Sequence, residues 1–202
     1  MLKYIVLEGM NMRKMLKENK GFSLVELLVA ILIMAVIAGT AITLFGGVLN
    51  SSRENADIET AESIKRAILT YMNSTNDVNL TCLGFSSAAG ESAAGVSSTV
   101  TSANLINYLG LETTIPASGS PTFKKPSNVT VSFTNPTGTK EASDIKGTYG
   151  PFLDLTKDMN PKTPGTTGWM IYIDRKMQVV TVKTTSTDGA SDAMVYFTTG
   201  QS

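Results

Sequence analysis

The sequence predicts an α+β fold, in which one long N-terminal helix packs by its second half on a head built around a small antiparallel β-sheet. Three patterns support this prediction: an uncharged apolar run from Leu27 to Phe45, an apolar stripe at helical spacing over residues 53–73, and strand-like alternation after residue 128. At 202 residues the chain has room for one compact domain and an appendage.

The apolar run is long enough to cross a membrane, because a bilayer core of about 30 Å needs roughly 20 helical residues at ~1.5 Å each. Basic residues outnumber acidic ones in residues 1–21, directly before the run. Positive segments tend to stay on the cytoplasmic side. We therefore expect a single-pass membrane protein with its C-terminus outside.

The helix is predicted to run from Phe22 to about Asn73, so that its second half extends beyond the membrane. No proline occurs before Pro116, and apolar residues follow at three- and four-residue spacing. The stripe consists of Ile58, Ala61, Ile64, Ile68, Tyr71 and Met72. Glu62 lies four residues before Arg66, which favours an ion pair on the helix surface.

The three glycines of the first half of the helix, Gly39, Gly46 and Gly47, have two interpretations. Each costs about 1 kcal/mol of helix stability relative to alanine. They therefore either mark places where the helix can melt, or allow another membrane helix to pack closely.

The head is predicted to contain a short helix at residues 102–111 and four strands. Small polar residues dominate between residues 75 and 128 and predict surface loops. The strand-like runs are residues 128–133, 169–173, 179–182 and 193–197. We expect these strands to form one antiparallel sheet on the outer half of the long helix.

Several kinds of chemistry are disfavoured by composition. The chain has no histidine and one cysteine, Cys82, so we expect no catalytic residues, no zinc site and no intramolecular disulfide. Cys82 is expected in a loop or partly buried. Lys plus Arg balance Asp plus Glu at 17 each, which makes nucleic acid an unexpected partner. We predict that the chain is not an enzyme.

Carboxylates in the head do not form a convincing site. Asp154 and Asp158 would share one face of a helix, where they are expected to be solvated. Asp188 and Asp192 flank a short loop that could hold calcium, although two carboxylates are few for an ion that takes six to eight oxygen ligands. We therefore expect no metal and no other cofactor, with calcium in the head as the alternative.

Glu26 is the unusual residue of the membrane segment. A carboxylate in hydrocarbon costs at least ~2.5–3.5 kcal/mol, and such residues usually have a partner or a function. One interpretation is that Glu26 lies close enough to the membrane surface to stay hydrated. The other is that it pairs with a positive charge that appears later.

The segment Lys20-Gly21-Phe22-Ser23-Leu24-Val25-Glu26-Leu27-Leu28, with its basic leader and apolar continuation, resembles the type IV pilin and pseudopilin precursor signature. The resemblance covers about residues 12–75. It implies that a prepilin peptidase cuts after Gly21, that the new N-terminus at Phe22 is methylated, and that Glu26 is used for assembly. Physically, the Phe22 amine of one subunit and Glu26 of the next would each neutralise the other, and breaking this pair would cost roughly 3–5 kcal/mol.

The expected organisation follows from this resemblance. Residues 1–21 are a leader that is removed, 22–49 the membrane and assembly half of the helix, 50–75 its amphipathic half, and 76–202 the head. The expected function is a structural subunit of a type IV pilus-like filament. Its partners would be other copies of the chain, the prepilin peptidase, an assembly platform and the membrane. The subunit would lie in the bacterial cytoplasmic membrane before assembly, with its C-terminus outside, and the assembled filament would be extracellular.

Several alternatives stay open. The chain could be a pseudopilin of a type II secretion or DNA-uptake apparatus, a minor pilin, or a membrane-tethered surface binding protein. Its apolar segment could be a secretory signal cut near Ala38-Gly39-Thr40-Ala41, although that leaves Glu26 unexplained. Translation could start at Met1 or at Met12.

Overall fold

The computed structural model describes residues 22–85, 101–130, 135, 136, 138, 146–186 and 195–198. Contacts divide the chain into two units, one ending at Leu49 and the other running from Asn50 to Ser202. The described elements are α2 (Leu24–Thr75), η1 (Thr81–Leu83), α3 (Ser102–Leu109), β1 (Glu112–Ile115), β2 (Thr122–Lys124), β3 (Gly147–Tyr149), β4 (Thr166–Asp174), β5 (Val179–Ser186) and β6 (Val195–Thr198).

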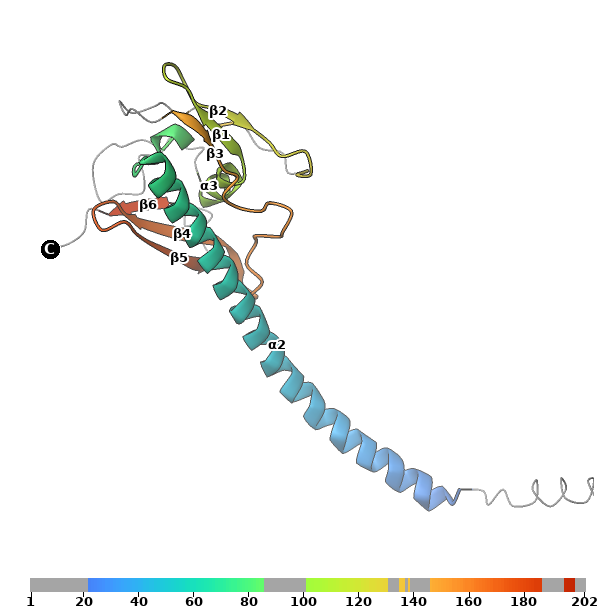
Figure 1. The fold of residues 1–202 in the computed structure, drawn as a ribbon. Helices are drawn as coiled ribbons and strands as arrows, with labels where there is room; N and C mark the ends of the chain where they lie inside the picture. The colour runs from blue at the N-terminus through green and yellow to red at the C-terminus, as the bar shows by residue number, and fades with distance from the viewer. Residues whose placement is uncertain are drawn as a thin grey trace, which may run out of the picture. The chain divides into compact units, whose positions relative to one another are not determined.

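Helix α2 confirms the predicted long N-terminal helix (Figure 1). Its 52 residues correspond to a length of about 78 Å at 1.5 Å per residue. In the second unit, its apolar stripe enters the core of the head: the buried side chains include Ile64, Ile68, Tyr71 and Met72. Ile58 departs from the prediction, because 62% of its surface is exposed.

The α+β fold class is confirmed, and the strands form two sheets of three strands (Figure 1). One sheet has the order β2-β1-β3 and is antiparallel throughout. The other has the order β5-β4-β6, and its central strand buries Trp169, Ile171 and Ile173 in alternation. These side chains join those of α2 and α3 in one hydrophobic core.

One strand pairing differs from the predicted antiparallel arrangement. β4 and β5 pair antiparallel as expected, but β6 pairs with β4 in parallel, with Ile171 opposite Val195 and Ile173 opposite Phe197. The reason is that β5 ends beside the start of β4, and β6 then runs back along the other edge of β4. Alternation determines which face of a strand is buried, but not which edge of a sheet the strand joins.

The predicted strand over residues 128–133 is not formed in its described part, because residues 128–130 lie in a turn and the segment after it. Its remaining residues lie outside the described residues, as do residues 86–100 of the region predicted to form surface loops. The predicted short helix is confirmed as α3, which Thr101 caps by accepting a hydrogen bond from the Asn104 N–H at 3.3 Å.

Three local predictions need correction. Glu62 pairs with Lys65 at 3.1 Å, whereas Arg66 donates to the backbone carbonyl of Glu62. Cys82 is buried in η1, since the chain turns back onto the core directly after α2. Asp154 lies outside any helix; its carboxylate caps the following turn by accepting from the N–H of Thr156 at 3.0 Å.

Candidate functional site

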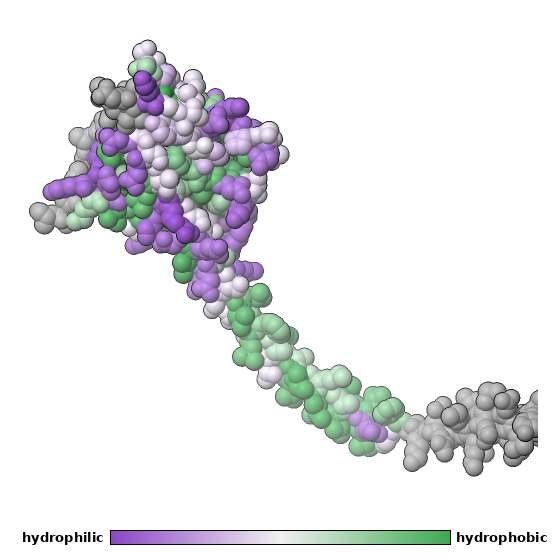
Figure 2. Space-filling view, in the orientation of Figure 1, coloured by the Kyte–Doolittle hydropathy of each residue, from purple (hydrophilic) through white to green (hydrophobic). Residues whose placement is uncertain are grey.

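The first half of α2 presents an apolar surface with no cover from the described chain. Residues 24–49 are all exposed except Ala41, which is half-buried. The most apolar window of the helix has a mean hydropathy of 2.7, and none of it is buried. Figure 2 shows this stretch as a mostly hydrophobic surface. By length and composition, α2 is the one described helix that can cross a membrane.

The threonine hydroxyls in this apolar stretch are already satisfied within the helix. Thr40 Oγ1 donates to the carbonyl of Ile37 at 3.0 Å, and Thr43 Oγ1 donates to the carbonyl of Thr40 at 2.8 Å. Back-bonding of this kind lets hydroxyl groups enter an apolar environment without an unpaired donor. The threonines therefore need no partner outside the helix.

Glu26 differs from these threonines, because its carboxylate accepts no hydrogen bond from a group of the same helix. It is the only charged residue between Phe22 and Ser52. It lies exposed in the first turn of α2, and no hydrogen bond or ion pair to its side chain forms within the described residues. The partial positive charge of a helix N-terminus favours a carboxylate there. In an apolar environment, however, full compensation needs a cation from elsewhere.

Phe22 lies just before the helix and is 81% exposed. The preceding residue, Gly21, is outside the described residues, as are residues 1–20. The predicted new N-terminus thus lies two residues before α2 begins, and Glu26 lies in the first turn of that helix. Their roles in methylation and assembly stay predictions.

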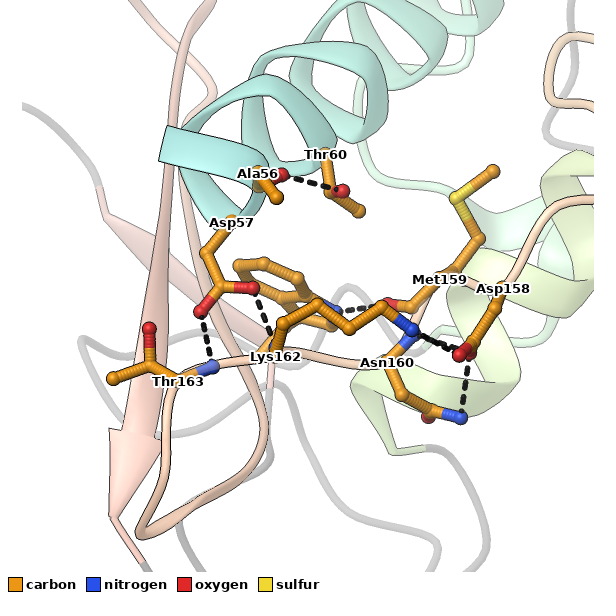
Figure 3. A network of polar contacts seen from close by, with 9 residues as sticks. Ala56, Asp57, Thr60, Asp158, Met159, Asn160, Lys162 and Thr163 are labelled. Atoms are coloured by element: carbon orange, nitrogen blue, oxygen red, sulfur yellow. Dashed lines mark hydrogen bonds and ion pairs between the residues drawn. The ribbon is translucent and has the colours of Figure 1, made fainter. Parts of the chain in front are cut away.

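A second carboxylate, Asp57, was missed by sequence analysis and lies at the start of the half of α2 that packs on the head. It is only 4% exposed. Its Oδ1 accepts from the backbone N–H of Lys162 at 2.5 Å, and its Oδ2 accepts from that of Thr163 at 2.9 Å (Figure 3). Asp57 thus ties the helix to the loop that precedes β4.

The ionised state of Asp57 is favoured by this arrangement. Burial alone would raise the pKa of the carboxyl group, but hydrogen bonds from Thr163 and Lys162 outweigh burial and hold the pKa below its usual value. The same loop is held on its other side by Trp169, whose indole N–H donates to the carbonyl of Met159 at 2.6 Å. The Lys162 ammonium pairs with Asp158 (Figure 3).

Asp77 organises the chain directly after α2. Its carboxylate accepts from the Tyr71 hydroxyl at 2.9 Å, from the Thr81 N–H at 2.9 Å and from the Cys82 N–H at 2.8 Å. Burial and the neighbouring Asp77 charge raise the pKa of Tyr71 well above its usual value, so the hydroxyl remains a donor at neutral pH. Asp77 is therefore a structural carboxylate.

The described part of the chain contains no group of three metal-ligating side chains. Asp154 and Asp158 each cap their own turn. The predicted calcium loop between Asp188 and Asp192 lies outside the described residues.

Comparison with known proteins assigns the N-terminal segment to a known motif. Residues 16–42 match the family model of the prokaryotic N-terminal methylation motif. A comparison with curated proteins finds no match, and a comparison with solved structures finds none either. The motif implies processing by a prepilin peptidase and anchoring in a membrane. Residues 16–42 of this chain therefore carry the type IV prepilin-like signature.

Proposed function

We propose that the chain is a structural subunit of a type IV pilus-like filament. In this proposal the leader is removed after Gly21, the amine of Phe22 is methylated, and the subunits assemble by packing the first halves of their α2 helices. The subunit itself performs no chemistry. Before assembly it is held in the membrane with its head outside.

The observation that supports this proposal is Glu26, the single charged residue in the exposed apolar first half of α2, within the segment that matches the methylation motif. A simple membrane tether would be more stable without it, because a charge in hydrocarbon costs several kcal/mol. The Phe22 amine of a neighbouring subunit is positively charged at pH 7. It would supply the positive charge that Glu26 does not find among the described residues of its own chain.

Replacing Glu26 tests the pairing. Losing one partner of a buried charge pair costs about 3–5 kcal/mol, a factor of roughly 150 to 5,000 in an assembly equilibrium. We expect Glu26→Ala and Glu26→Gln to reach the membrane at normal levels and to yield no sheared surface fibres. Glu59→Ala is the matched control, since Glu59 is an exposed glutamate in the amphipathic half of the same helix.

The processed form should be read from fibres of the unaltered protein. N-terminal sequencing and intact mass should show a chain that begins at Phe22 and is one methyl group heavier than the sequence predicts. Fibres that lack this chain, or that contain it with residues 1–21 attached, would contradict the proposal. Processed protein without any surface fibre would indicate instead a pseudopilin of a secretion or DNA-uptake apparatus.

A further inference from the structure

The head exposes few large apolar side chains. In the described part of the second unit these are Ile58, Met177 and Val179, which are 62%, 66% and 50% exposed. They belong to two separate features. Ile58 lies in a groove between α2 and β5, whereas Met177 and Val179 belong to the turn that joins β4 to β5. Figure 2 shows hydrophobic patches of this kind within a mostly polar head surface.

The groove, which we call the helix groove, has a volume of 540 Å³. Ile58 and Ala61 of α2 line it on one side, and Val182 of β5 lines it on the other, with Trp169 between them. Lys183 and Glu54 also border the groove. It lies beside Asp57, whose two hydrogen bonds to the loop at 162–163 hold α2 in place there.

The turn, which we call the hairpin tip, comprises residues 174–179. Its backbone is held by Asp174, whose Oδ1 accepts from the N–H groups of Lys176 and Met177, both at 2.9 Å. Arg175 is held by the ring of Phe197, 5.1 Å from its guanidinium carbon, and by Asn79 at 3.0 Å. The tip is therefore an ordered projection that keeps Met177 exposed.

The helix groove and the hairpin tip both expose apolar side chains, and their net charges are opposite. Lys176 on the hairpin tip is exposed, and Glu54 at the helix groove is exposed too. Neither forms an ion pair within the residues that the structure describes. The groove also carries Lys183, but Glu54 and the ionised Asp57 leave it with an excess of negative charge. The tip carries Arg175 and Lys176 against Asp174, an excess of positive charge.

We propose that the hairpin tip of one copy docks in the helix groove of a second copy. Met177 and Val179 would cover the apolar surface around Ile58, and Lys176 would pair with Glu54. In the proposed arrangement each subunit offers its tip to one neighbour and its groove to another, which makes the contact heterologous and leaves a free tip and a free groove at the two ends. Such a contact repeats along an open chain, whereas a reciprocal exchange between two copies would stop at a dimer.

The contact is small, and this inference rests on the proposed function, because assembly through α2 would have to bring the heads together. Two exposed side chains and one ion pair make a weak interface when they act alone. Packing of the α2 helices would hold neighbouring heads together at high effective concentration, where a weak second contact is occupied. The contact goes beyond helix packing because it would fix which face of each head meets its neighbour.

Disulfide trapping in cells that express the full chain tests the contact. Ile58→Cys combined with Met177→Cys should give, after mild oxidation, a ladder of covalent dimers, trimers and longer forms. Each single variant should give at most a dimer. Cys82 is buried and is retained. The matched control pairs Met177→Cys with Ser118→Cys, an exposed position in the turn between β1 and β2, and should give no ladder.

Charge reversal tests the orientation of the contact in the same cysteine background. Glu54→Lys or Lys176→Glu alone should lower the yield of the ladder by about two- to fivefold, the effect expected for one exposed ion pair. The two substitutions together should restore it. If the double reversal does not restore the yield, Lys176 does not meet Glu54 and the proposed orientation is wrong.

Fibre yield, measured from sheared cells in parallel, separates this proposal from the proposed function. Fibres that form normally but give no ladder, or that give an equal ladder with Ser118→Cys, would overturn the head contact alone. A ladder in membranes of cells whose unaltered protein makes no fibres would support the head contact and overturn the filament proposal. If the helix groove instead binds a small ligand, fibres would again form without a ladder, and the head contact would be overturned.

Discussion

Asp57→Asn is the substitution that most directly tests how the head is attached to α2. The carboxylate is nearly fully buried and accepts one hydrogen bond through each oxygen, from the N–H groups of Lys162 and Thr163. Asparagine has almost the same shape, but only one of its two terminal atoms can accept. The substitution therefore removes one hydrogen bond and the negative charge while leaving the packing unchanged.

The expected loss follows from the geometry. A hydrogen bond to a charged group contributes about 1.5–3 kcal/mol. Lys162 is an exposed residue, and the solvent around it weakens the electrostatic part of the bond, which favours the lower end of this range. At about 2–4 °C per kcal/mol for a domain of this size, Tm should fall by roughly 3–6 °C if the loss is near 1.5 kcal/mol.

Trp169 is the only tryptophan of the chain, and it reports on this region because its indole binds the loop that Asp57 holds. Thermal unfolding of the full chain in detergent, followed by its fluorescence, measures the change. Asp154→Asn is the matched control, since Asp154 is exposed and caps only its own turn. Equal Tm values for Asp57→Asn and the control would refute the reasoning.

The pH dependence gives the same experiment a second test. The pKa of Asp57 is lowered in the folded state, so its stabilisation is present above the unfolded pKa of about 3.9 and is lost as the pH falls through the lower folded pKa. The difference in Tm between the unaltered protein and Asp57→Asn should be constant at neutral pH and shrink below about pH 4. A difference that persists to the lowest pH would contradict ionisation as its source.

Two further predictions concern other parts of α2. Tyr71→Phe keeps the ring but removes the hydroxyl that donates to Asp77, so we expect the free energy of unfolding to fall by about 1.5 kcal/mol in chemical denaturation; an unchanged value would contradict the bond. A Cβ added at Gly46 has no atom within 4 Å in the isolated chain, so Gly46→Ala should not lower the amount of the protein in the membrane. The yield of fibres should fall if another helix packs closely at this position. Unchanged fibres would mean that no helix approaches Gly46.

Sequence patterns predicted the elements whose signal is local and repeated. Helix α2 has an uninterrupted apolar run followed by a helical stripe, and the pair β4 and β5 alternates over enough residues to show a buried face. The antiparallel sheet of β1, β2 and β3 was not predicted, because strands of three or four residues rich in threonine are too short to show a period. Its pairing depends on contacts between segments distant in the sequence.

The two carboxylates of the candidate site differ in how far the sequence could predict them, because only one of them has a local signal. Glu26 can be recognised without a structure, because it is a charged residue whose neighbours in the sequence are apolar. The role of Asp57 depends on partners 105 and 106 residues away, which no local pattern specifies. A signal was nevertheless present: Asp57 lies four residues before Ala61 and seven before Ile64, so a carboxylate occupies the apolar stripe. A polar residue at such a position needs a buried partner.

The exchange of roles between Asp57 and Ile58 links the fold to the proposed head contact. Periodicity placed Ile58 in the core, but the structure gives the buried position to Asp57 and leaves Ile58 exposed beside it. Had the stripe been apolar throughout, the groove beside β5 would carry no anchor for the loop at 162–163. Instead, the carboxylate binds that loop, and the adjacent isoleucine stays exposed, where the proposed head contact would cover it. An exposed isoleucine next to a buried aspartate is therefore the arrangement expected where a helix must both hold its own head and receive a neighbour's.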